Sequence, residues 1–191
     1  MFPIEAFQET LDKFTSILRR HQVRFHLTGG VTSVAYAEPR MTQDIDIVVD
    51  NAAFSQNLVA ILDELSIGNY LFDEQSVRSA IAKHKMFQLL YIAESLKLDI
   101  YPRELVEGEL ERSGIIELFD GVFYPIASRN DTAIAKLLWV EQGSHKSRRD
   151  LRHLFLTASR EEQAQITQLA MELGKQSLLQ EVLAEIDEID L

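Results

Sequence analysis

The feature that most constrains this chain is a pair of aspartates placed two residues apart in a β-branched segment. Asp44 and Asp46 alternate with apolar residues in the segment DIDIVV, residues 44–49. Side chains of a β-strand alternate between its two faces with a period of two. The carboxylates are therefore predicted to share one face while Ile45 and Ile47 point into a core. Such a pair can bind one hard divalent cation or bridge two, although a lone pair is more often simply exposed on a sheet surface.

A third aspartate lies in a later strand candidate. Asp99 stands between Leu98 and Ile100, so the period of two places its side chain on the face opposite to theirs. If this strand neighbours the first, Asp99 joins Asp44 and Asp46. Three carboxylates in one place repel one another strongly unless a cation neutralises them. With Mg²⁺ they would form a two-metal template for phosphoryl transfer.

A glycine pair precedes the three acids. Gly29 and Gly30 follow a strand candidate at residues 23–27 and open a short predicted helix. Glycine allows backbone N–H groups to approach phosphate oxygens closely, and a helix N-terminus adds its dipole. The hydroxyls of Thr32 and Ser33 could add further donors. Taken alone, however, a glycine pair is more often an ordinary tight turn.

The periodicity of apolar residues divides the chain into two regions. Strand and helix patterns alternate up to about residue 127, whereas the pattern beyond it is helical. We therefore predict an α/β core at residues 1–127 and a helical region at residues 128–191 packed on it, with a cleft between them. Helices are predicted at residues 4–21, 31–36, 50–65, 74–84, 104–112, 129–142, 147–158, 160–173 and 175–188. Strands are predicted at residues 23–27, 45–49, 86–92, 96–101, 115–119 and 122–126.

Charge and composition exclude several classes of protein. The 191 residues include 30 acids and 19 Lys or Arg, which gives a net charge of -11. Extended DNA binding is not expected, because neutralised phosphates supply most of the affinity of such proteins. The lack of cysteine excludes disulfides and thiolate metal sites. No apolar stretch reaches the roughly 18 residues of a membrane span, and the N-terminal segment does not look like a signal peptide, so we expect a cytoplasmic protein without membrane partners.

The three motifs together resemble a known family. The segment TGGVTS at residues 28–33 is followed by RMTQDIDI at residues 40–47 and by LDI at residues 98–100. This order resembles the DNA-polymerase-β-like nucleotidyltransferases, which have a glycine motif opening a helix, an acid pair and a third acid on a following strand. The RxTxDID form is similar to the small bacterial groups that include the AbiEii-type toxins. The resemblance covers about residues 20–102 and extends more weakly to residues 131–150.

The resemblance implies an α+β nucleotidyltransferase fold, in which a mixed β-sheet is flanked by helices and followed by a C-terminal helical region. It implies that Asp44 and Asp46 bind two Mg²⁺ ions, with Mn²⁺ as an alternative, and that Asp99 is the third metal ligand and activates the acceptor. The implied reaction transfers a nucleoside monophosphate from an NTP to a hydroxyl of a protein, a tRNA or a small molecule and releases pyrophosphate. A cognate antitoxin or toxin protein is an implied partner. The alternative function is a non-catalytic nucleotide-binding partner or sensor of a toxin–antitoxin system.

The resemblance also implies a nucleotide-binding set. Its members are Gly29, Gly30, Thr32, Ser33, Arg40 and Lys136. Many family members have a serine directly after the first glycine, where this chain has Gly30, so the hydroxyl role would pass to Thr32 or Ser33. Lys136 resembles a helical lysine that approaches a nucleotide phosphate, with a solvated helix lysine as the alternative. Asp50 is instead predicted to cap a helix.

Overall fold

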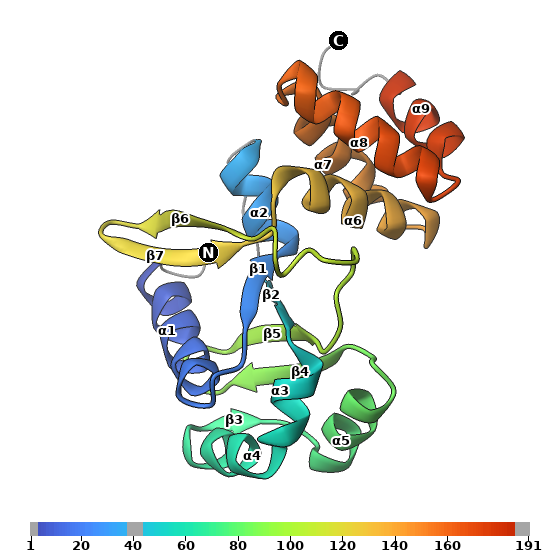
Figure 1. The fold of residues 1–191 in the computed structure, drawn as a ribbon. Helices are drawn as coiled ribbons and strands as arrows, with labels where there is room; N and C mark the ends of the chain where they lie inside the picture. The colour runs from blue at the N-terminus through green and yellow to red at the C-terminus, as the bar shows by residue number, and fades with distance from the viewer. Residues whose placement is uncertain (1–3, 38–43, 186–191) are drawn as a thin grey trace. The chain divides into compact units, whose positions relative to one another are not determined.

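The computed structural model describes residues 4–37 and 44–185 (Figure 1). Arg40, a predicted nucleotide-binding residue, lies outside the described residues. The chain forms two compact units and passes from the first to the second between Val31 and Thr32, and again between Ala127 and Ser128. The first unit contains the β-sheet, and the second is helical.

In the described residues of the first unit, seven strands form one mixed sheet. The strands are β1 (Phe25–Thr28), β2 (Asp44–Val49), β3 (Tyr70–Leu71), β4 (Phe87–Tyr91), β5 (Leu96–Tyr101), β6 (Gly114–Phe119) and β7 (Val122–Ile126). Their order in the sheet is β3-β4-β5-β2-β1-β7-β6. The central strand β2 runs parallel to β5 and antiparallel to β1, while β1 runs parallel to β7. This mixed sheet with flanking helices confirms the predicted α+β class.

Alternation along the central strands separates a core from a polar face. In β2, Ile45 and Ile47 are fully buried, whereas the aspartates that flank Ile45 are partly exposed. The neighbouring strand β5 repeats the pattern, with Leu98 and Ile100 fully buried. Complete burial of one such side chain contributes about 1.5–3 kcal/mol. The apolar residues therefore fix which face of the sheet carries the acids.

The described residues of the first unit also form the helices α1 (Ile4–Arg20), α3 (Asn51–Gln56), α4 (Leu58–Ile67) and α5 (Glu74–Ala82). The predicted cap is confirmed, because Asp50 accepts hydrogen bonds from the backbone N–H groups of Ala52 and Ala53. The single helix predicted at residues 50–65 is instead two helices. Asn57 breaks it: the φ of this residue is −105°, and its side-chain amide donates to the carbonyl of Ala53.

The prediction of a helix at residues 104–112 is wrong, because this segment forms turns. Backbone N–H groups in this segment donate to two side-chain carboxylates, whereas in a helix they would donate to backbone carbonyl groups. Glu104 accepts from the backbone N–H groups of Gly108 and Leu110, and Glu109 accepts from that of Leu105. Gly108 also has a φ of +76°, which an α-helix does not allow. Side chains that bond the nearby backbone compete with helix formation in this way.

The second unit consists of most of α2 (Gly29–Tyr36) together with α6 (Arg129–Glu141), α7 (His145–Leu156), α8 (Arg160–Glu172) and α9 (Gln176–Ala184). The last four correspond to the helices predicted beyond residue 128, and α2 corresponds to the helix predicted at residues 31–36. Side-chain hydroxyls cap three of them at the N-terminus, namely Ser128, Ser144 and Ser159. None of the helices within residues 4–37 and 44–185 is sufficiently long and apolar to cross a membrane.

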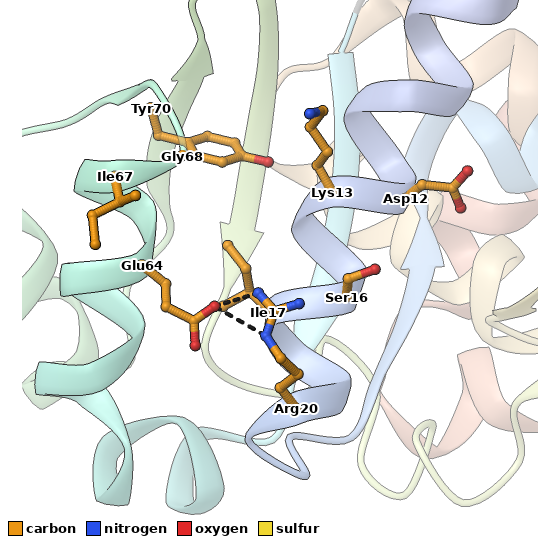
Figure 2. Close-up of a pocket in the computed structure, with 9 residues that line it drawn as sticks. All are labelled: Asp12, Lys13, Ser16, Ile17, Arg20, Glu64, Ile67, Gly68 and Tyr70. Atoms are coloured by element: carbon orange, nitrogen blue, oxygen red, sulfur yellow. Dashed lines mark hydrogen bonds and ion pairs between the residues drawn. The ribbon is translucent and has the colours of Figure 1, made fainter.

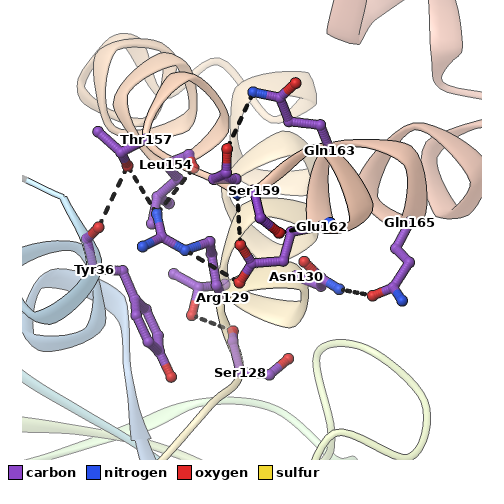
Figure 3. A network of polar contacts seen from close by, with 12 residues as sticks. Tyr36, Ser128, Arg129, Asn130, Leu154, Thr157, Ser159, Glu162, Gln163 and Gln165 are labelled. Atoms are coloured by element: carbon purple, nitrogen blue, oxygen red, sulfur yellow. Dashed lines mark hydrogen bonds and ion pairs between the residues drawn. The ribbon is translucent and has the colours of Figure 1, made fainter.

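Arg129 connects several helices of the second unit (Figure 3). Its Nη1 atom donates to the backbone carbonyl of Leu154 at 3.2 Å and to Oγ1 of Thr157 at 2.8 Å, and its Nε atom lies 3.4 Å from Glu162. The guanidinium carbon also lies 5.3 Å from the ring centroid of Tyr36. Burial raises the pKa of Tyr36 to about 12. Arg129 thus holds α2 together with α6, α7 and α8.

Candidate functional site

The three predicted acids occupy adjacent positions on one face of the sheet. Asp46 on β2 is in register with Asp99 on the parallel strand β5, and Asp44 is in register with Lys97. Residues in register on neighbouring strands project to the same face, and Asp44 and Asp46 share a face because they are two residues apart. The register of β2 and β5 therefore supplies what the sequence left open, namely that the two strands are neighbours.

The Asp46 carboxylate lies against the predicted glycine pair. The backbone N–H of Gly30 donates to Oδ2 of Asp46 at 3.4 Å. Gly29 has a φ of +66°, and a Cβ atom at this position would lie 2.0 Å from the same oxygen. Only glycine fits at position 29, because any other residue would strain this backbone and its Cβ would collide with the Asp46 carboxylate. The carboxylate also sits at the N-terminus of α2, where the helix dipole stabilises a negative charge.

Tyr101 holds the other oxygen of Asp46. Its hydroxyl donates to Oδ1 at 3.3 Å. Burial raises the pKa of Tyr101, and the negative charges of Asp46 and Asp99 raise it further, so the hydroxyl keeps its proton and remains a donor. No role for Tyr101 was predicted from the sequence. Its position two residues after Asp99 on the same strand was the signal that could have indicated it.

Gln88 on β4 makes the corresponding contact with Asp99. The two residues are in register, and Nε2 of Gln88 donates to Oδ1 of Asp99 at 3.0 Å. Burial raises the pKa of the Asp99 carboxyl, and the charge of Asp44 acts in the same direction. The hydrogen bond from Gln88 and the charge of Lys97 oppose this rise. Sequence alone could not have indicated Gln88, because its role depends on the pairing of β4 with β5.

We call the side of the sheet that carries Asp44, Asp46 and Asp99 the acid face. Its carboxylate oxygens are the type of ligand that a hard divalent cation binds. In the described part of the chain, however, no three Asp, Glu or His side chains are arranged to hold one ion together. The Asp46 carboxylate is turned towards Gly30 and Tyr101, and Oδ1 of Asp44 lies 3.2 Å from Nζ of Lys97. The strand register thus brings the three carboxylates to one face of the sheet, while their side chains contact other partners in this structure.

The second unit contains the remaining predicted residues that the structure describes. Nζ of Lys136 lies 2.7 Å from Oδ2 of Asp150, and Oγ of Ser33 donates to the same oxygen at 3.4 Å. Lys136 is only 4% exposed, so it is not a solvated helix lysine. Thr32 is fully buried, and Trp139 places its ring centroid 5.0 Å from the Lys136 ammonium. The nucleotide-binding roles of these residues stay predictions.

A pocket in the first unit is lined by other residues than the three acids (Figure 2). It has a volume of about 420 Å³ and lies between α1 and the end of α4. Arg20 and Glu64 form an ion pair across it, and Nε2 of His21 lies 2.7 Å from the same carboxylate. Hydrogen bonds from Arg20 and then from His21 lower the pKa of Glu64. Lys13 and Asp12 also line the pocket, so its charges balance and do not favour a phosphate.

Three solved structures align with most of this chain. The solution structure of the antibiotic-resistance factor ANT(2'')-Ia aligns with 93% of this chain and 97% of its own, with a TM-score of 0.59 at 13% identity. The crystal structure of the lincosamide antibiotic adenylyltransferase LnuA with bound lincomycin aligns with 82% of this chain and 99% of its own, with a TM-score of 0.49 at 17% identity. An antigenic nucleotidyltransferase-like protein from Paracoccidioides brasiliensis covers 92% of this chain and 94% of its own, with a TM-score of 0.43 at 15% identity. At such low identity the first of these likenesses shows the fold alone.

The family follows from the sequence itself. The model of the family described as "Nucleotidyl transferase AbiEii toxin, Type IV TA system" matches residues 16–171. This match spans most of the chain, which therefore belongs to the AbiEii nucleotidyltransferase family and is a nucleotidyltransferase. Comparison with curated protein sequences gives no significant match. The predicted family resemblance is confirmed, and the matched range includes the glycine pair, the three acids and Lys136.

Proposed function

We propose that the chain is a metal-dependent enzyme that transfers a nucleoside monophosphate from an NTP to a hydroxyl of a protein, a tRNA or a small molecule. The observation that carries this proposal is the parallel register of β2 and β5, which aligns Asp46 with Asp99 and places Asp44 on the same face. Carboxylates gathered in this way suit divalent cations and the triphosphate that such cations accompany. The net charge of -11 argues mildly against long nucleic acids as acceptors.

In this mechanism Asp44 and Asp46 would hold Mg²⁺, as two ions, with Mn²⁺ as an alternative. Bound metal would neutralise the triphosphate and make the acceptor hydroxyl more acidic. Asp99 would be the third ligand and would take the hydroxyl proton, while Gln88 fixes the orientation of its carboxylate. The acceptor oxygen bonds to the α-phosphorus, the bond from that phosphorus to the β-phosphate oxygen breaks, and pyrophosphate leaves.

The glycine pair is proposed to hold the triphosphate. The N–H of Gly30 and the N-terminus of α2 together form an anion-binding position, which the Asp46 carboxylate contacts in the structure. We retain Ser33, Thr32 and Lys136 as proposed nucleotide-binding residues. Lys136 would have to exchange its contact with Asp150 for one with a phosphate oxygen, and both are the charge-assisted contacts that lysine makes readily.

The test is incubation with each α-³²P-labelled NTP and Mg²⁺, with and without total tRNA and a cell lysate, followed by gel electrophoresis. We expect a labelled band that disappears with EDTA and in the Asp46→Asn variant. The position of the band identifies the class of acceptor. Full labelling by Asp46→Asn would reject the metal assignment. Binding of Mg·NTP by calorimetry without any transfer would favour the non-catalytic sensor.

The toxin role is proposed from the family description alone. We expect induced expression of the wild-type chain to slow the growth of a bacterial host, and expression of Asp46→Asn at the same level to leave growth unchanged. Equal inhibition by both chains would separate toxicity from nucleotidyl transfer. A cognate antitoxin would then be sought as the protein whose co-expression restores growth.

A further inference from the structure

Lys97 is a cation placed directly within the acid face. It lies two residues before Asp99 on β5, and it is in register with Asp44 on β2. The period of two therefore projects its side chain to the same face as the three acids. Its Nζ atom lies 3.2 Å from Oδ1 of Asp44, and its side chain is 51% exposed. No role for Lys97 was predicted from the sequence.

The contact between Lys97 and Asp44 is not needed to hold the sheet together. Ion pairs between exposed side chains contribute little to stability, because solvent screens their attraction and ordering them costs side-chain entropy. The strands are already held by the ladder between β2 and β5 and by the buried residues Ile45 and Leu98. The stability of the sheet therefore does not explain the position of Lys97, and its positive charge beside the three carboxylates does.

Two properties of lysine suit it to an anionic substrate here. Its ammonium is a compact charge with three donors on a flexible stem, which allows it to move between neighbouring oxygen atoms. A triphosphate approaching Asp46 and Asp99 also meets carboxylates of its own sign, and Lys97 lies on their face to offset this repulsion. An ammonium and a divalent cation would compete for the same Asp44 oxygen, since both carry positive charge.

We propose that Lys97 is a phosphate-binding residue of the nucleotide site. Its ammonium pairs with Asp44 and moves to a triphosphate oxygen when that carboxylate binds a cation. The inference rests on the proposed function and adds a residue to it. It implies opposite effects of Lys97 on two ligands: the lysine weakens the binding of metal alone and strengthens the binding of nucleotide in the presence of metal.

The experiment compares Lys97→Met, which keeps the length of the stem, with Lys97→Arg, which keeps the charge. Lys13→Met is the matched control, because Lys13 is also 51% exposed and lies 3.6 Å from the carboxylate of Glu9. Calorimetry measures the affinity for Mg²⁺ alone. It then measures, at saturating Mg²⁺, the affinity for whichever of ATP, GTP, CTP and UTP the wild-type chain binds most tightly.

We expect Lys97→Met to bind Mg²⁺ more tightly than the wild-type chain and to bind the nucleotide about tenfold more weakly, as loss of one charge-assisted contact implies. Lys97→Arg should recover most of this loss, and Lys13→Met should behave as wild type. Unchanged nucleotide affinity in Lys97→Met, with binding lost in Asp46→Asn, would overturn the role of Lys97 alone. Parallel loss of Mg²⁺ and nucleotide binding in Lys97→Met would also overturn it. Nucleotide binding unaffected in Asp46→Asn, or absent from the wild-type chain, would reject the proposed function itself.

Discussion

The Asp46 carboxylate lies where a side chain at position 29 would begin. We therefore expect Gly29→Ala to displace this carboxylate as well as to strain a backbone whose φ is +66°. The backbone strain alone costs roughly 1–2 kcal/mol, because an L side chain in the left-handed region meets its own carbonyl oxygen. The displacement adds to this cost and should also weaken the binding of Mg·NTP. Chemical denaturation and calorimetry measure the two effects.

Gly121 provides the control for this substitution. Its φ is +72°, but no atom lies within 4 Å of the position that a Cβ would take. Gly121→Ala should therefore show the strain of the backbone without any effect on ligand binding. Equal loss of stability and unchanged Mg·NTP binding in the two variants would show that the contact between Gly29 and Asp46 is unimportant.

Asp99 is expected to make stability depend on pH. Burial raises its pKa in the folded chain above the ordinary value of 3.8. Stability is therefore lost as the pH rises from 3.8 through the folded pKa, because the unfolded chain releases the proton first. Asp99→Asn should unfold at a higher temperature than the wild type near pH 7 in EDTA. This advantage should shrink as the pH falls towards 4, and a variant that is less stable at pH 7 would contradict the prediction.

At the scale of elements, a buried ion pair joins α6 to α7. The side chains of Lys136 and Asp150 are 5% and 7% exposed, and Ser33 of α2 donates to the same carboxylate. Lys136→Met leaves a buried carboxylate without its cation, so it should cost about 3–5 kcal/mol. The double variant with Asp150→Asn should recover most of this loss. A single variant as stable as the wild type in urea would show that solvent reaches this carboxylate.

Sequence periodicity predicted the elements where burial is one-sided. The strands β2 and β5 alternate apolar and polar residues, and their faces were predicted correctly. The two-residue strand β3 is too short to show a period, and the segment at residues 104–112 has helical spacing that its own carboxylates override. That Asp44 and Asp46 share a face was predicted for the same reason. The contact of Gln88 with Asp99 was not predicted, because it is set by pairing between strands rather than by local sequence.

At the scale of the whole molecule, the division into units does not follow the order of the chain. The sequence indicated one division, after residue 127, whereas the second division falls inside the continuous helix α2 and has no local signal. The part of α2 beyond Val31 makes its contacts with the helical unit: Ser33 with Asp150, and Tyr36 with Arg129. A cut after Ala127 would therefore separate these groups from their partners.

We expect a fragment of residues 1–127 to be less stable than the full chain. It would expose the buried Thr32 and Ser33, together with the ring of Tyr36 that Arg129 covers. Its unfolding temperature should be several degrees lower, and it should aggregate more readily on heating. Circular dichroism on the fragment and the full chain measures this difference. Identical unfolding of the sheet in both would show that the first unit does not depend on the helical residues.

The alternation of Asp44, Ile45, Asp46 and Ile47 also has a consequence for how the sheet assembles. Sliding β2 by one residue against β5 would turn both carboxylates into the core and both isoleucines into water. Burying unpaired carboxylates costs several kcal/mol each, so the misaligned register is much less stable than the correct one. Replacing both aspartates with leucine would leave a continuous apolar strand that tolerates several alignments and invites aggregation. Asp44 and Asp46, which are proposed to bind metal, thus also favour the correct register of β2 against β5 during folding.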